Sequence, residues 1–137
     1  MITPPLKHFD IVIVDFGPMV DSSSVQVGIR PALVLQPTSM NISSTTTIVC
    51  PLSSVKKKLF YPYHIVLGKR FGLRMDSIAL LEQISVIDQS AIIKRVGHIE
   101  DTLVIARINK GLCSILGIPE IEHMTSELSH GRQGYGK

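Results

Sequence analysis

Short apolar stretches, separated by polar and glycine-rich segments, run along the first hundred residues of the chain. Each stretch is rich in Val, Ile or Leu, a composition and length typical of β-strands. The predicted strands are Phe9–Phe16, Ile29–Gln36, Thr46–Leu52 and Tyr63–Gly68. Ser77–Asp88 is long enough for one bent strand or a pair of strands, and 89–99 suits a helical turn followed by a strand.

The segments between these strands differ in length and composition. Gly17–Gly28 is a long loop of Gly, Pro, Ser and Asp, and long loops in compact domains are more often functional than idle. Pro37–Thr45 is short and is predicted to turn the chain, which makes its flanking strands antiparallel. Ser53–Pro62 is a second exposed loop, and Lys69–Asp76 is a basic connection.

One strong helix is expected near the end of the chain. Asp101 is a good N-cap, and Gly117 with Pro119 ends the helix. The apolar stripe consists of Ile105, Ile108, Leu112, Ile115 and Leu116. We therefore expect one domain over 1–117, followed by a polar extension over 118–137 that frays.

Several short strands with one C-terminal helix predict a small α+β fold that is mainly β. The strand lengths and turn signals favour a strongly curved, SH3-like β-barrel. The helix is too apolar to lie on the surface uncovered. A neighbouring element is therefore expected to cover its apolar stripe.

Composition agrees with one folded, cytoplasmic domain. Of 137 residues, 45% are hydrophobic and 18% are charged, which excludes a disordered chain. The net charge of +3 is compatible with a polyanionic partner or with a merely solvated basic face. Cys50 and Cys113 lie in apolar runs and are expected to be buried thiols. No run is long enough to span a membrane, and the N-terminus lacks a signal-peptide pattern.

Motifs for metals, nucleotide cofactors and hydrolytic triads are absent from the sequence. The five histidines form no metal-ligand spacing with each other or with cysteines. Neither a G-x-S-x-G elbow nor a G-x-x-x-x-G-K phosphate loop occurs. We therefore predict no metal and no cofactor.

Arg30 is the first candidate for chemistry, because it stands at the start of a predicted strand. Pro31 biases Arg30 toward extended geometry, so the arginine is held on a stiff backbone. A guanidinium is always charged, and its fork matches two phosphate oxygens. The alternative is a structural ion pair with Asp15 or Glu82, and the pattern leaves both roles open.

A basic segment interleaved with aromatic residues is the second candidate. Lys56–Lys58 lie close to Phe60, Tyr61 and Tyr63, a combination that can attract a phosphate backbone and stack bases. It can equally be a solvated charge run.

Two further polar residues have open roles. His64 can shuttle a proton, or it can be a structural histidine. Ser53 approaches the loop before Arg30 if the second and third strands pair.

The order of several segments resembles the PemK/MazF family of toxins. The segments are "DIVIVDFGP", "SVQVGIRPALVLQ", "TTIVCPLSS", "GLRMDSIALLEQISVID" and "KRVGHI". The resemblance covers roughly Phe9 to Leu116. It implies a PemK/CcdB-type barrel that forms a two-fold homodimer, with single-stranded RNA in a groove along the interface.

The resemblance also implies an activity and a partner. The activity is metal-independent, sequence-specific cleavage of single-stranded RNA, usually mRNA. The ribose 2′-OH attacks the adjacent phosphate and gives a 2′,3′-cyclic phosphate and a 5′-OH product. A cognate antitoxin would block the groove with a segment that folds on binding.

Site residues follow from the same resemblance. Arg30 matches the catalytic arginine, Ser53 stands where a catalytic threonine is usual, and Gln26 matches a loop glutamine. Arg30 would then face the negative charge that gathers on the phosphorane. The expected RNA-contacting residues are Ser24, Gln26, Ser54, Lys56, Lys57, Lys58, His64, Ser77 and Gln83.

Four positions depart from the family pattern. Val25 replaces a common glutamate, which leaves the general base open between Ser53, His64 and water. Phe9 and Val27 stand at usual glycine positions, and Ser85 replaces a common arginine. Two other readings therefore stay open: a gyrase poison of the same fold that acts through its C-terminal helix, and a degenerate member that binds RNA without cleaving it.

Overall fold

A computed structural model of the chain describes residues 4–18, 27–54, 59 and 62–119. The larger elements are β1 (Asp10–Asp15), β2 (Ile29–Val34), α1 (Thr38–Ser43), β3 (Thr46–Ser53), β4 (His64–Gly68), β5 (Ser77–Leu80), β6 (Ser85–Asp88), β7 (Ile92–His98) and α2 (Thr102–Leu116). Short 3-10 turns, η1 (Leu81–Gln83) and η2 (Gln89–Ala91), precede β6 and β7. The predicted α+β fold, mainly β with a C-terminal helix, is confirmed.

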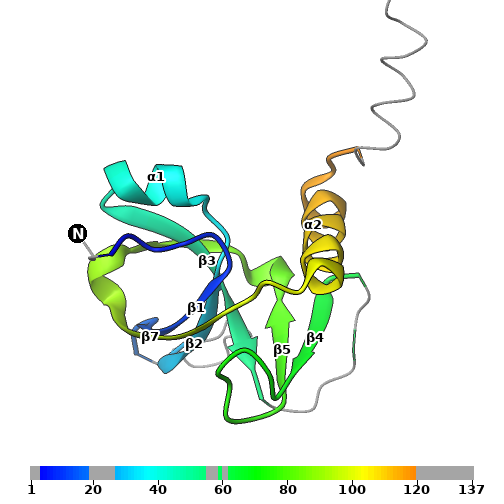
Figure 1. The fold of residues 1–137 in the computed structure, drawn as a ribbon, viewed down its shortest axis with the longest axis horizontal. Helices are drawn as coiled ribbons and strands as arrows, with labels where there is room; N and C mark the ends of the chain where they lie inside the picture. The colour runs from blue at the N-terminus through cyan, green and yellow to red at the C-terminus, as the bar shows by residue number, and fades with distance from the viewer. Residues whose placement is uncertain (1–3, 19–26, 55–58, 60–61, 120–137) are drawn as a thin grey trace, which may run out of the picture.

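The strands form one curved antiparallel sheet rather than a closed barrel (Figure 1). Its order is β4-β5-β3-β2-β1-β7, and β6 pairs with β3 off this path. The predicted antiparallel pairing of β2 with β3 is confirmed, with Ala32 opposite Pro51 and Leu33 opposite Cys50. The segment 77–88 forms a pair of strands, β5 and β6, because η1 turns the chain between them.

One local prediction is wrong: the segment between β2 and β3 is not a simple turn but contains the short helix α1. Its Asn41 is almost fully buried and accepts hydrogen bonds from Gln36 Nε2 at 2.9 Å and Thr47 Oγ1 at 2.7 Å. The Asn41 amide donates to the carbonyls of Leu6 and Gln36. This buried polar cluster stabilises a helix that has no side-chain cap of its own.

Both faces of the sheet are buried, because side chains alternate along each strand. One face packs beneath α2, and its buried cluster includes Ile11, Leu33, Cys50, Leu52, Ile65 and Ile108. The other face contributes Val12, Val14, Ala32, Val34 and Val49 to a separate cluster with Leu6. Adjacent residues of one strand therefore point to opposite faces of the sheet, and this applies to Arg30 and Pro31 of β2.

The predicted C-terminal helix is confirmed with both of its caps. Asp101 accepts hydrogen bonds from the amides of Leu103 and Val104, at 3.0 and 3.2 Å, and Gly117 adopts the left-handed conformation. Gly111 lets α2 lie close to η1, since a Cβ there would come within 2.5 Å of Leu81 and 2.6 Å of a backbone carbonyl. The stripe predicted from sequence is covered at Ile105, Ile108, Leu112 and Ile115, whereas Leu116, the last residue of α2, is 55% exposed.

The cysteines differ from each other. Cys50 is fully buried, and burial raises the pKa of its thiol. Cys113 is only half-buried, so the expectation of two buried thiols is wrong for this residue, because its side of α2 lies at the margin of the core. None of the described helices is long and apolar enough to cross a membrane.

Candidate active site

Arg30 lies near the start of β2, as predicted, and is half-buried. It is paired with Val14 of β1, and its Nε donates a hydrogen bond of 2.9 Å to the carbonyl of Val27. The backbone around the side chain is therefore fixed on one side by β1, and the guanidinium is anchored to the preceding segment. Glu82, one of the two carboxylates considered as an ion-pair partner of Arg30, pairs with His64 at 3.0 Å.

The β2–β3 pairing bears on how Ser53 lies relative to Arg30. It ends at Ala32 opposite Pro51, and a continuation by two residues would set Arg30 across from Ser53. Residues that are opposite in an antiparallel pair point to the same face of the sheet. The expected approach of the Ser53 hydroxyl to the segment around Arg30 is compatible with this register and stays a prediction.

Ser53 belongs to β3 rather than to the loop that follows, and it is paired with Ile78 of β5. Only 1% of its surface is exposed, whereas the next residue, Ser54, is exposed. A hydroxyl at that depth can orient a neighbouring donor. Direct contact with a substrate phosphate requires the surrounding chain to open.

His64 is held away from Ser53 by the sheet. It starts β4 opposite Leu80 of β5, whereas Ser53 lies on β3 opposite Ile78. With β5 between them, the two backbones are about 10 Å apart across the sheet, at about 4.8 Å per strand. Its buried ring bonds to the Glu82 carboxylate through Nε2, and this favours the structural role for His64.

The remaining predicted contact residues fall in three places. Ser77 is buried and donates a hydrogen bond of 2.8 Å to the Met75 carbonyl. Gln83 lies in η1 and borders a cavity of about 630 Å³ that also includes Val27 and Ser85. Five predicted residues lie outside the described part of the chain: Ser24, Gln26, Lys56, Lys57 and Lys58.

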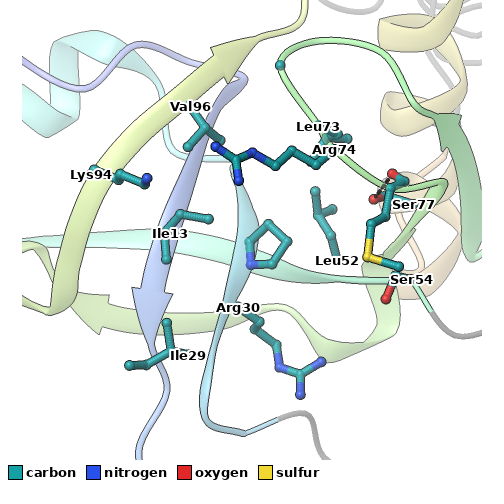
Figure 2. A pocket seen from close by; sticks show the side chains of 13 residues that line it. Ile13, Ile29, Arg30, Leu52, Ser54, Leu73, Arg74, Ser77, Lys94 and Val96 are labelled. Atoms are coloured by element: carbon teal, nitrogen blue, oxygen red, sulfur yellow. Dashed lines mark hydrogen bonds between the residues drawn. The ribbon is translucent and has the colours of Figure 1, made fainter.

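A second cavity, of about 510 Å³, opens beside the start of β2 and is called the Pro31 cavity below. Its lining comprises Ile13, Ile29, Arg30, Pro31, Leu52, Ser54, Gly72, Leu73, Arg74, Met75, Ser77, Lys94 and Val96. The floor follows one row across three strands, since Ile13 pairs with Pro31 on one side and with Lys94 on the other. Figure 2 shows the head of Arg30 directed away from those of Arg74 and Lys94.

Arg74 and Lys94 were not predicted as site residues. The first lies in the basic connection between β4 and β5, and the second lies in β7. Each looks like a solvated charge in the sequence, because only the sheet brings the two segments to one cavity. The basic composition of 69–76 was the one available signal.

Phe9 is one of the two departures from glycine that the structure describes, and it does adopt the conformation that favours glycine. Its φ is 71°, and its ring stacks on His8 at 3.7 Å between centroids. Phe9 is buried in the core beneath α2, and its amide donates to the Val34 carbonyl. Packing and hydrogen bonding therefore offset the backbone strain here.

No group of three or more metal-ligating side chains gathers anywhere in the described part of the chain. The groups available at the start of β2 are the Arg30 guanidinium, hydroxyl groups and the Pro31 cavity, which has cationic side chains at both ends. Such a set suits the binding of a phosphodiester and the stabilisation of charge that develops on it.

Comparison with known proteins gives a consistent result. Residues 7–116 match the model of the family described as PemK-like, MazF-like toxins of type II toxin–antitoxin systems. Endoribonuclease EndoA of Bacillus subtilis is 35% identical over 99 residues, which cover 72% of this chain and 84% of EndoA.

Solved structures agree with the sequence comparisons. MazF of Deinococcus radiodurans is similar with a TM-score of 0.69 and 25% identity, over 83% of this chain and 98% of that one. A MazE–MazF structure from the same organism matches with a TM-score of 0.66 and 25% identity, over the same shares of the two chains. The chain belongs to the PemK-like, MazF-like toxins of type II toxin–antitoxin systems.

Proposed function

We propose that this toxin is a sequence-specific, metal-independent endoribonuclease that cleaves single-stranded RNA, including mRNA. The ribose 2′-OH attacks the adjacent phosphorus, the bond to the 5′ oxygen of the next nucleotide breaks, and the products carry a 2′,3′-cyclic phosphate and a 5′-OH. The 35% identity to an endoribonuclease over most of the chain supports the activity.

Arg30 carries the proposal. Its position near the start of β2, the hydrogen bond of its Nε to the Val27 carbonyl and the register toward Ser53 favour a guanidinium preorganised for a phosphorane. Ser53 acts through its hydroxyl, either directly on the phosphate or by orienting a neighbouring donor. The general base is Ser53 or water, since the buried ring of His64 is bonded to Glu82.

The proposed assembly follows the family resemblance. The toxin acts as a homodimer in the cytoplasm, and a cognate antitoxin blocks its RNA groove. The similarity to a MazE–MazF structure supports the antitoxin partner. Ser54, Ser77 and Gln83 are retained as proposed RNA contacts, because all three line the cavities beside or near β2.

The test is cleavage of several long single-stranded RNAs by the purified toxin in excess EDTA, with 5′-OH ends mapped by sequencing. We expect cuts at a short recurring motif, cyclic phosphate at the upstream ends, and no cuts by the Arg30→Ala variant. Arg107→Ala is the matched control, since Arg107 lies exposed on α2.

Three results would overturn the proposal. The first is a wild type that leaves every RNA intact while arresting growth with broken DNA, which is the behaviour of a gyrase poison. The second is cleavage that requires a divalent cation. The third is binding of RNA without any cuts, which would identify the degenerate member.

A further inference from the structure

Two cations lie at the end of the Pro31 cavity that the head of Arg30 does not face. Arg74 and Lys94 are both exposed, and Figure 2 shows their side chains on the same side of the cavity. Neither forms an ion pair with another described residue. Arg70, on the same loop as Arg74, pairs with Asp101 at 2.7 Å and stacks over Phe71 at 4.4 Å.

The fold holds both cations at this position. Lys94 stands across Ile13 from Pro31, so its backbone belongs to the row that forms the cavity floor. The loop bearing Arg74 is packed against β7, where a Cβ on Gly72 would collide with the Val96 carbonyl. A Cβ on Gly97 would likewise collide with the Phe71 carbonyl. Such backbone-to-backbone packing leaves the loop little freedom.

The lining indicates which chemical group fits. It includes three cationic side chains and no carboxylate among the described residues. The floor is aliphatic, with Ile13, Leu52 and Val96, and the lining has no aromatic ring. Base recognition in single strands depends largely on aromatic stacking, whereas a phosphate needs only nearby cations. The cavity therefore suits a nucleic-acid backbone better than a base.

We propose that Arg74 and Lys94 together bind a backbone phosphate of the RNA substrate, beyond the nucleotides that Arg30 engages. The cavity between them and Arg30 accommodates the intervening sugar–phosphate segment. The pair increases affinity for any single strand and does not read sequence. This inference rests on the proposed function, because it places the RNA at both ends of one cavity.

The contact predicts a specific binding signature. The logarithm of the association constant falls linearly with the logarithm of the salt concentration, and each phosphate contact makes this fall steeper by about 0.7 for single strands. The variant Arg74→Gln/Lys94→Gln should therefore bind RNA about tenfold more weakly at low salt, with a dependence on salt that is less steep by about 0.7. Its KM for RNA should rise by a similar factor, because the contact holds the substrate strand rather than the reacting atoms.

The experiment uses a fully 2′-O-methylated single strand, which has no 2′-OH to attack and stays intact. Binding to the full-length toxin is measured from low to moderate salt for the wild type and the double variant. The variant Arg107→Gln/Lys110→Gln is the matched control, because it removes the same charge from exposed positions of α2. Circular dichroism melting checks that all three proteins are folded.

The proposal is overturned if the double variant keeps the wild-type affinity and salt slope, or if the α2 control loses as much of both. It is also overturned if the double variant loses binding of poly-L-aspartate while RNA binding is unchanged, since the cavity would then be a site for an acidic peptide. A wild type that binds the strand but never cuts RNA refutes the nuclease proposal and leaves the phosphate contact standing.

Discussion

The two ends of the Pro31 cavity hold their cations in different ways. At one end, Arg30 is half-buried, lies within a strand pair and donates a hydrogen bond to the Val27 carbonyl. At the other end, Arg74 and Lys94 are exposed and form no ion pair with a described residue. At Arg30 both the backbone and the side chain are held in place. At Arg74 and Lys94 only the backbone is held.

This difference indicates a division of roles. Stabilising charge that appears only in the transition state requires a donor whose position is set in advance. Holding a phosphate on the way to the site requires only nearby charge, and flexible exposed side chains supply it. We therefore expect changes at the Arg30 end to affect kcat, and changes at the far end to affect binding.

The largest effect is expected for Arg30→Ala. Removal of one preorganised donor should lower kcat by about 10²- to 10³-fold, equivalent to about 3–4 kcal/mol of transition-state stabilisation, with little change in KM. Single-turnover cleavage of an RNA that carries one mapped site measures this effect. A variant that mainly raises KM would instead place Arg30 in the same binding role as Arg74 and Lys94.

Gly97→Ala should break the far end of the cavity. The added methyl group collides with the backbone of the loop bearing Arg74, so folding should weaken by about 1–3 kcal/mol and the loop should move. Urea denaturation measures the stability, and the salt slope of RNA binding reports the displaced cation.

Gly68→Ala is the control for Gly97→Ala. Gly68 also lies near the β4–β5 loop, with a φ of 70°, and a Cβ there would meet nothing within 4 Å. It should show backbone strain without the change in salt slope. Equal salt slopes for the two variants would contradict the role of the close packing.

His64→Asn tests whether any catalytic proton transfer depends on β4. The ring is buried and bonded to Glu82, so we expect a loss of stability of about 1–3 kcal/mol and less than a tenfold fall in kcat. The shape of the pH–rate profile should stay that of the wild type. If the pH–rate profile of the variant loses either its acidic or its basic limb, His64 is the general base.

The smallest effect is expected at Asp101, which caps α2 and anchors Arg70. The hydrogen bond from Arg70, together with those from the capped amides, lowers the pKa of this carboxyl group. Its contribution to stability is therefore present at neutral pH and is lost as the pH falls through the lowered pKa.

Two variants separate the functions of Asp101. Asp101→Asn keeps the cap and loses the charge on the partner of Arg70, so its melting temperature should fall less than that of Asp101→Ala. Thermal melts at neutral pH and at pH 3 measure both variants. Equal falls for the two variants would show that the ion pair, rather than the cap, stabilises this corner.

Local patterns were sufficient for much of the fold. The β-branched runs predicted the strands, and Asp101 and Gly117 predicted the ends of α2, because caps and strand propensity depend on a few neighbouring residues. Arg30 followed by Pro31 predicted a held cation for the same reason. The helix α1 escaped this reasoning, since its stability comes from Asn41 bonding to residues of distant segments.

The sequence by itself determined the strands of the sheet, the capped helix and the stiff backbone at Arg30, because each depends on contacts within a few residues. Only the tertiary structure decided that Ser53 is buried, that His64 bonds to Glu82, and that Arg74 and Lys94 share a cavity. These outcomes depend on strand register and on the close packing of Gly72 and Gly97. Such contacts join segments that are far apart in the sequence, and the residues of one segment do not reveal which other segment it contacts.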